Sequence, residues 1–299
     1  MKPLLYCLLP ILSYFSMPVT AQTLSTPLVR KNVAVQAFSA LSIQGPVNVT
    51  IDTSQTNPSI PPLQIFGDPK TVSAVTWKIK NHTLYLDTKW TYRPHRGDKL
   101  TIKVNTTPSQ LSQIDFNSNG RLFGQGLTGS LSLISRGNGS INLSTNKLNL
   151  KSLVSHGESN ISLYHVNSTD LSIQGKNSGK IKIEGDVALH TINLTGNGTL
   201  LVHWVNSPYL KINASGNEKI FLAGVTKTLD MHLSEKSHLF AKQLRAENGF
   251  VETKNQANAK VSVKQKLSAL AQDNSTIYYS KPVEFLNTFT KNTGLVLSN

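Results

Sequence analysis

The stretch SRGNGSINLS (residues 135–144) places a small polar turn before a short strand in which apolar and polar residues alternate. Related stretches follow at SHGESNISLY (155–164), KNSGKIKIEG (176–185) and TGNGTLLVHW (195–204). Self-similarity at a short, fixed period is typical of a repeat architecture, in which each unit packs mainly against its neighbours. The repeat is therefore the main evidence for the fold.

The apolar residues that follow the turns give the length of the repeat. These anchors recur at intervals of about 20 residues, regularly as far as Leu239 and less regularly beyond it. The anchors are Leu122, Ile141, Ile161, Ile181, Leu200, Ile220, Leu239, Val261, Ile277 and Leu295. Such a period, with two or three short strands in each unit, predicts a parallel β-helix with one repeat per coil. At about 4.8 Å per coil, nine intervals predict a rod about 43 Å long.

The residues between the turns favour strands over helices. Segments such as LSLIS (131–135) and INLTG (192–196) alternate with a period of two, which buries one face of each strand. Ser, Thr, Asn, Val and Ile dominate these segments, and an apolar stripe with the period of a helix is missing from the sequence. We therefore expect an all-β protein.

The turns have a structural explanation. A sharp bend at the same place in every coil favours Gly and Asn, which adopt positive φ at low cost. Residues 137–139, 196–198 and 216–217 fit this requirement, and Asn residues stacked on one another would form an amide ladder. Later turns use other residues, as at 236–237, 257–259 and 273–274. We interpret the Gly-Asn-Gly motif as a corner of the scaffold rather than a ligand loop.

The N-terminal segment 1–21 has the features of a secretory signal peptide. Lys2 precedes an apolar run from Leu4 to Phe15, and a small-residue exit predicts cleavage between Ala21 and Gln22. Cys7 could instead indicate lipid attachment, but it lies inside the apolar run. The sequence thus predicts export to the periplasm, the outer surface or the medium.

The remaining chain reads as one domain. We expect a linker at 22–35 and a single β-helix domain at 36–299, with N-terminal strands or a cap at 36–108 and regular coils at 109–299. In the N-terminal part, the turns within IQGPVNVTI (43–51) and KNHT (80–83) are predicted to connect strands tightly. A cap is expected because an open end of a β-helix invites edge-to-edge pairing.

Charge and cysteine content limit the function. Without Cys7 the exported chain has no thiol, which excludes disulfides, zinc–thiolate sites and cysteine nucleophiles. Removal of Lys2 lowers the formal net charge from +14 to +13, which is still strongly basic. Such a surface attracts anionic glycans, lipopolysaccharide or another anionic envelope component. Nucleic acid is a poorer match because few aromatic residues alternate with the basic ones.

Several lysines fall near successive corners and would form a basic stripe along a rod with a constant period. The alternative is that they are distributed over the surface and serve solubility. The lysines singled out as ligand-binding candidates are Lys180, Lys182, Lys219, Lys260 and Lys264.

A second candidate is the basic–aromatic segment KWTYRPHRGDK (89–99), which is predicted to be an exposed loop. Its candidate ligand-binding residues are Trp90, Tyr92, Arg93 and Arg96. Aromatic rings beside cations can bind sugars or phosphates.

Signs of catalysis are weak. The sequence has no nucleophile elbow, zinc-protease motif or phosphate loop, and its eight histidines are scattered, so we expect no metal and no cofactor. The enzyme alternative is a polysaccharide lyase or hydrolase acting on acidic polysaccharide, which needs converging carboxylates. Glu184, Asp186 and Asp170 are the local acidic cluster that could serve it, although a solvated turn explains them better.

The chain resembles a known family over roughly residues 36–297. FSALSIQGPVNVTI (38–51), GDPKTVSAVTWKIKNHTLYL (67–86) and NSTIYYSKPVEF (274–285) are similar to the ends of the bacterial DUF2807 family, named for a head GIN domain of auto-transporter adhesins. The resemblance implies a right-handed parallel β-helix exported to the cell envelope. Its implied function is binding or structural, adhesin-like, without an assured activity.

Overall fold

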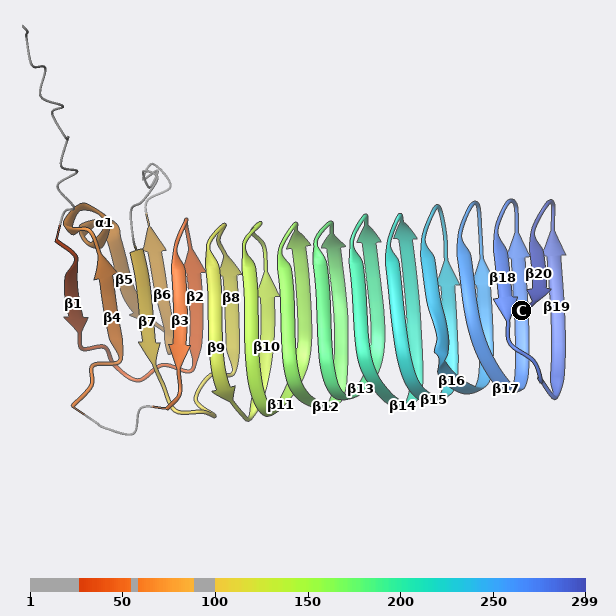
Figure 1. Ribbon diagram of the computed structural model, residues 1–299, viewed down its shortest axis with the longest axis horizontal. Helices are drawn as coiled ribbons and strands as arrows, with labels where there is room; N and C mark the ends of the chain where they lie inside the picture. The colour runs from red at the N-terminus through yellow and green to blue at the C-terminus, as the bar shows by residue number, and fades with distance from the viewer. Residues whose placement is uncertain (1–26, 55–58, 89–99) are drawn as a thin grey trace, which may run out of the picture.

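The computed structural model describes residues 27–54, 59–88 and 100–299. In these residues the protein is an all-β solenoid of about ten turns, which confirms the predicted fold class (Figure 1). The predicted signal peptide lies outside the described residues. Among the described residues, the six-residue α1 (Pro69–Ala74) is the helix present, and no helix there could span a bilayer.

Each coil contributes one straight segment to each of two sheets that face one another. Sheet I begins with β1 (Val29–Val33), β4 (Leu63–Gly67), β7 (Leu100–Asn105), β3 (Asn48–Asp52) and β9 (Arg121–Leu127). Sheet II begins with β5 (Val75–Lys80), β6 (Thr83–Thr88), β2 (Ala40–Gln44), β8 (Gln113–Asn117) and β10 (Ser130–Ser135). Strand neighbours therefore define two broad outer faces of the rod.

Seven long strands then run through both sheets and pass from one to the other at the lower end of the rod in Figure 1. They are β11 (Ser140–Gly157), β12 (Asn160–Asn177), β13 (Lys180–Gly196), β14 (Thr199–Gly216), β15 (Lys219–Leu233), β16 (His238–Thr253) and β17 (Asn258–Gln272). Sheet I ends with β18 (Thr276–Tyr279) and β20 (Leu295–Ser298), and sheet II ends with β19 (Phe285–Lys291). We call the bend inside each long strand the lower bend and the turn between consecutive strands the upper corner, as in Figure 1.

The core is one column of apolar side chains between the two sheets. Inward residues at equivalent positions stack in parallel register from coil to coil, and nearly all are fully buried. The register confirms the anchors from Leu122 to Leu239, but Leu239 pairs with Ala259, which pairs with Ile277, which pairs with Val296. The predicted anchors Val261 and Leu295 were wrong, since the core accepts the small Ala259 and the coils keep a nearly constant length.

Strands β2 and β3 do not form the first coil of the rod, although they come early in the sequence. Strand β2 pairs with β6 on one side and β8 on the other, while β3 pairs with β7 and β9. In Figure 1 this coil stands between coils formed by later residues. The turn at 45–47 is thus an upper corner, whereas the turn at 80–83 joins the antiparallel strands β5 and β6.

Antiparallel strands form the N-terminal end of the rod. Strand β1, which lies within residues 22–35, pairs antiparallel with β4, and β4 pairs antiparallel with β7. Helix α1 leads from β4 in sheet I to β5 in sheet II. The parallel edge of the first coil is therefore paired with strands of the opposite direction.

Glycine is required at some corners because the neighbouring coil stacks too closely for a Cβ, and not only because of the turn conformation. Gly137 and Gly139 lie outside the positive-φ region expected for them, but a Cβ on Gly137 would come within 2.2 Å of the Ser118 carbonyl oxygen. Later corners place Glu235 and Asn255 at φ of 60° and 62°. The expected Asn ladder is absent as an amide–amide stack at the described corners: Asn138 accepts from the backbone N–H of Glu158 instead.

The lower bend of β13 should tolerate no side chain at Gly185. Its φ is +144°, and a Cβ would lie 1.9 Å from the Val166 carbonyl oxygen of the preceding coil. We expect Gly185→Ala to destabilise the protein by about 3 kcal/mol, measured as the midpoint of urea unfolding by circular dichroism. Gly129→Ala is the control, because it has φ of +78° but no contact closer than 3.4 Å, and we expect it to cost about 1 kcal/mol. Equal losses would show that stacking distance is not the constraint.

Candidate functional site

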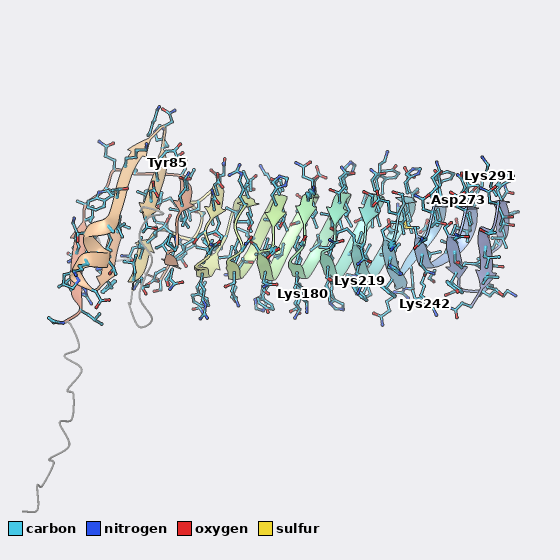
Figure 2. All side chains as sticks on the ribbon, turned by 90° about the horizontal axis from the view of Figure 1, so that it is seen from above. Tyr85, Lys180, Lys219, Lys242, Asp273 and Lys291 are labelled. Carbon is cyan, nitrogen blue, oxygen red and sulfur yellow. The ribbon has the colours of Figure 1, made fainter. Side chains whose placement is uncertain are left out.

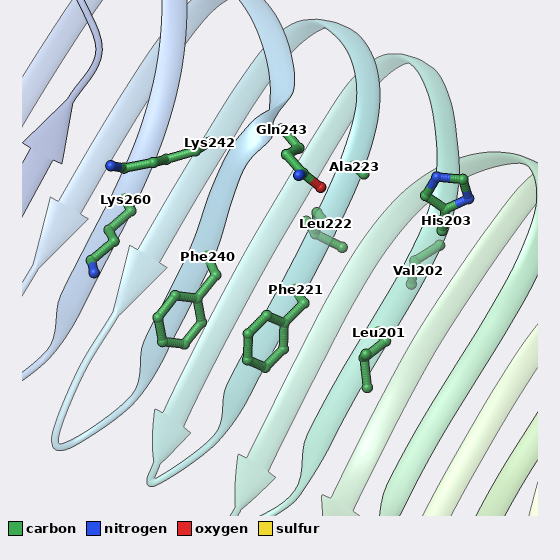
Figure 3. Close-up of a pocket in the computed structure, with 10 residues that line it drawn as sticks. All are labelled: Leu201, Val202, His203, Phe221, Leu222, Ala223, Phe240, Lys242, Gln243 and Lys260. Atoms are coloured by element: carbon green, nitrogen blue, oxygen red, sulfur yellow. The ribbon is translucent and has the colours of Figure 1, made fainter. Parts of the chain in front are cut away.

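A row of outward-facing side chains on sheet I forms the candidate site. Strand pairing aligns one residue per coil at the position that follows each anchor. The aligned residues are Lys182, Leu201, Phe221, Phe240, Lys260 and Tyr278. Figure 3 shows Leu201, Phe221, Phe240 and Lys260 side by side on consecutive strands. The row therefore has an apolar centre with a lysine on each side of it.

A groove of about 530 Å³ opens beside this row. Strand β16 carries one extra residue here, since Phe221 pairs with Phe240 but Ala223 pairs with Gln243. This bulge displaces Lys242 from the regular pattern, and the small, buried Ala223 leaves space opposite it. The lining residues are Leu201, Val202, His203, Phe221, Leu222, Ala223, Phe240, Lys242, Gln243 and Lys260.

The aromatic rings give the groove a rigid apolar wall. Phe221 and Phe240 stack with their centroids 4.5 Å apart and their planes 8° from parallel. The Lys260 ammonium lies 5.5 Å from the Phe240 centroid and 5.9 Å from the Tyr278 centroid. Phe221 remains 37% exposed, so apolar surface and positive charge face solvent together.

The predicted lysines separate into two groups. Lys180 and Lys219 occupy the row before the anchors of sheet I, and Lys182 and Lys260 occupy the row after them. Lys264 lies at the lower bend of β17, away from both rows, between the parts of the strand that pair with β18 and β19. In Figure 2, Lys180, Lys219 and Lys242, another lysine of the expected basic stripe, lie along one side of the rod.

Most of these lysines have charge available for a ligand. Within the described residues, Lys180, Lys219, Lys242 and Lys260 have no carboxylate within 4.0 Å. Lys182 differs, because its ammonium lies 2.6 Å from Glu184, and the hydrogen bond to that carboxylate raises the pKa of Lys182. The four unpaired lysines lie on sheet I segments of β13 to β17, one to two coils apart.

Of the other predicted site residues, those that the structure describes do not line the groove or the lysine rows. Trp90, Tyr92, Arg93 and Arg96 lie outside the described residues. Glu184 is ion-paired, while Asp186 and Asp170 are exposed near the lower bends. The described residues contain no group of three or more His, Cys, Asp or Glu side chains arranged for a metal ion.

One titratable residue that sequence reasoning missed is Glu218. It occupies the inward corner position held by Gly198 and Ser237 in the neighbouring coils, and it is fully buried. Neither carboxylate oxygen makes a well-formed hydrogen bond. Burial raises the pKa of Glu218, and the nearby backbone N–H of Gly198 opposes that rise only in part.

Comparison with protein families shows to which family this chain belongs. The geometry described above is that of a parallel β-solenoid with an apolar and cationic groove on one face. The chain matches the family described as "DUF2807: Putative auto-transporter adhesin, head GIN domain" over residues 37–204 and 190–282. These matches cover most of the chain, and the protein belongs to this family, as its sequence resemblance predicted.

Several solved structures are similar to this chain at low sequence identity. A "putative adhesin" from Parabacteroides merdae is 16% identical, with 91% of this chain and 96% of that chain covered and a TM-score of 0.49. A "putative adhesin" from Parabacteroides distasonis is 14% identical, with coverages of 92% and 98% and a TM-score of 0.46. A "putative lipid binding protein" from the same species is 12% identical, with coverages of 91% and 96% and a TM-score of 0.44. Comparison with curated protein sequences gives no match.

Glu218 should make stability depend on pH. Because its pKa is raised in the folded state, the folded protein holds the proton while the unfolded chain releases it above pH of about 4.3. We expect wild type to lose stability relative to Glu218→Gln from that pH up to the folded-state pKa, by at most about 1.4 kcal/mol per pH unit. Urea unfolding between pH 4 and pH 8 measures the difference.

The exposed Glu235 provides the control for this experiment, because it also lies at an upper corner. Glu235→Gln should give a pH profile parallel to that of wild type. A parallel profile for Glu218→Gln would contradict the assignment of a neutral buried carboxyl.

Proposed function

We propose that the protein is exported and binds an anionic component of a cell envelope through the groove and lysine rows of sheet I. The observation that carries the proposal is the apolar row of Leu201, Phe221 and Phe240, beside which Lys242 and Lys260 line the groove without a carboxylate partner among the described residues. Family membership and the predicted signal peptide support a place in the envelope or outside the cell.

The chemistry of the groove suggests what such a ligand presents. Unpaired ammonium groups attract phosphate or carboxylate groups. The range of this electrostatic attraction decreases as the salt concentration rises. The stacked phenylalanines add apolar surface that a purely ionic ligand would not use. Anionic glycans and lipopolysaccharide share anionic groups beside apolar or CH-rich surface, and the acyl chains of lipopolysaccharide add a larger apolar part.

Regular spacing supports recognition of a linear or repeating ligand. Coils are about 4.8 Å apart, so Lys180 and Lys219, two coils apart in one row, are separated by about 10 Å along the rod. Lys182 and Lys260 are four coils apart in the adjacent row, at about 19 Å. A rigid array of this kind needs little ordering when it binds.

The lyase or hydrolase alternative has less support. Its proposed carboxylate Glu184 is engaged by Lys182, and Asp186 and Asp170 lie at lower bends rather than in the groove. A general acid–base pair needs two carboxyl groups facing one bound sugar.

Removal of the groove lysines tests the proposal. We expect Lys242→Gln with Lys260→Gln to weaken retention on immobilised lipopolysaccharide and heparin about tenfold and to lower the salt concentration of elution. Lys264→Gln with Lys266→Gln removes the same charge at the lower bend and at the adjoining start of sheet II, and it should change retention far less. Equal effects of the two pairs, or no salt-sensitive retention of wild type, would contradict the proposal.

A substitution in the apolar row distinguishes the two ligand sources. Phe240→Ser should weaken retention on lipopolysaccharide but leave heparin binding nearly unchanged if acyl chains contact the rings. Equal weakening on both matrices would identify the glycan as the shared ligand.

A further inference from the structure

A second groove, of about 450 Å³, lies on sheet II and shares no lining residue with the first. It crosses the sheet II segments of β13 to β16. The lining residues are Asn193, Leu194, Thr195, Asn213, Ala214, Ser215, His232, Leu233, Ser234, Glu252 and Lys254. Its outward side chains are mostly neutral and hydrogen-bonding, in contrast to the phenylalanines and lysines of sheet I.

Small polar side chains form the floor of this groove. Asn213 donates its side-chain N–H to the side-chain oxygen of Asn193 at 2.7 Å, so the two amides are fixed in orientation. This pair leaves further donor and acceptor capacity on both amides, because each amide has two N–H groups and two lone pairs. Ser215 and Ser234 continue the neighbouring row with hydroxyl groups of small volume.

A hydrogen-bonded chain of side chains borders the groove, and its members His232 and Glu252 form one wall. The two ring nitrogens of His232 contact Asp230 at 3.2 Å and Glu252 at 2.9 Å. Tyr209 donates to the second oxygen of Asp230 at 2.7 Å. Because each member is held by a neighbour on another coil, the wall is preorganised.

The far end of this wall contributes two more donors. Gln272 donates to Glu252 at 3.0 Å, and the Lys254 ammonium lies 3.7 Å from the same carboxylate oxygen. Two carboxylates thus share the wall with one ammonium and one imidazole, so the wall has no excess of positive charge. A strongly anionic ligand would gain little from it.

Aromatic rings lie beside the polar wall. Phe250 is 42% exposed, and its ring centroid is 5.6 Å from that of His232. Tyr209 is 36% exposed on the other side of Asp230. Exposed rings next to fixed carboxylates and amides suit a ligand with hydroxyl groups on its edges and CH groups on its faces.

We propose that the sheet II groove binds an uncharged saccharide. The carboxylate of Glu252, which lines the groove, would accept hydrogen bonds from sugar hydroxyls, and the amides of Asn193 and Asn213 would exchange hydrogen bonds with adjacent hydroxyls. This site is independent of the anionic ligand proposed for sheet I, and binding here is insensitive to salt.

Affinity electrophoresis in gels that contain dextran, mannan or galactan tests the proposal. We expect at least one of these neutral polysaccharides to retard the full-length exported protein, with the retardation retained at high salt. Asn213→Leu fills the floor and should abolish retardation. Gln174→Leu is the matched control, because Gln174 precedes Asn193 in the same row but does not line the groove.

Two further variants separate the possible outcomes. Glu252→Gln keeps the shape of the wall but removes one charged acceptor, and it should weaken binding about tenfold. Lys242→Gln with Lys260→Gln should leave neutral polysaccharide binding unchanged even if it abolishes binding of anionic ligands. The proposal is overturned if no polysaccharide retards wild type, or if Asn213→Leu and Gln174→Leu have equal effects.

Discussion

The parallel stacking of coils, about 4.8 Å apart, is the constraint on which the rest of the structure depends. Along the regular long strands each segment hydrogen-bonds to the same part of the preceding coil, so apart from local register shifts a residue is covered by its equivalent one period later. Bends must therefore bring two backbones together without a Cβ between them, as at Gly185 over Val166. The same constraint places outward side chains in straight rows, and both candidate grooves consist of such rows.

Much of the fold could be predicted because stacking enforces a period and alternation enforces a buried face. The predictions that were wrong show the limits of the apolar pattern and of the repeat period. Ala259 was missed as an anchor because the sequence pattern favours the larger Val261, whereas the register depends on backbone pairing. The place of β2 and β3 between later coils was also hidden, because a period describes the spacing of coils but not the order in which the chain visits them.

The sites were predictable to a smaller extent, and for a definite reason. Lys180, Lys182, Lys219 and Lys260 followed from the period, but the groove depends on the extra residue in β16, which shifts Lys242 out of phase. The sheet II wall did have a signal: His232 and Glu252, Glu252 and Gln272, and Asn193 and Asn213 are each separated by one full period. Applying the period to polar residues as well as to apolar anchors would have brought these pairs together.

The two grooves belong to the same few coils but to opposite sheets, which lie about 10 Å apart in a packed pair. In the described part of the chain, the rigid apolar core between them contains no charged side chain from either groove, so little conformational coupling is expected across it. If both proposed ligands bind, the anionic one on sheet I and the uncharged saccharide on sheet II would occupy opposite faces of the rod without competing. The solenoid would then act as a rigid bridge between two different molecules.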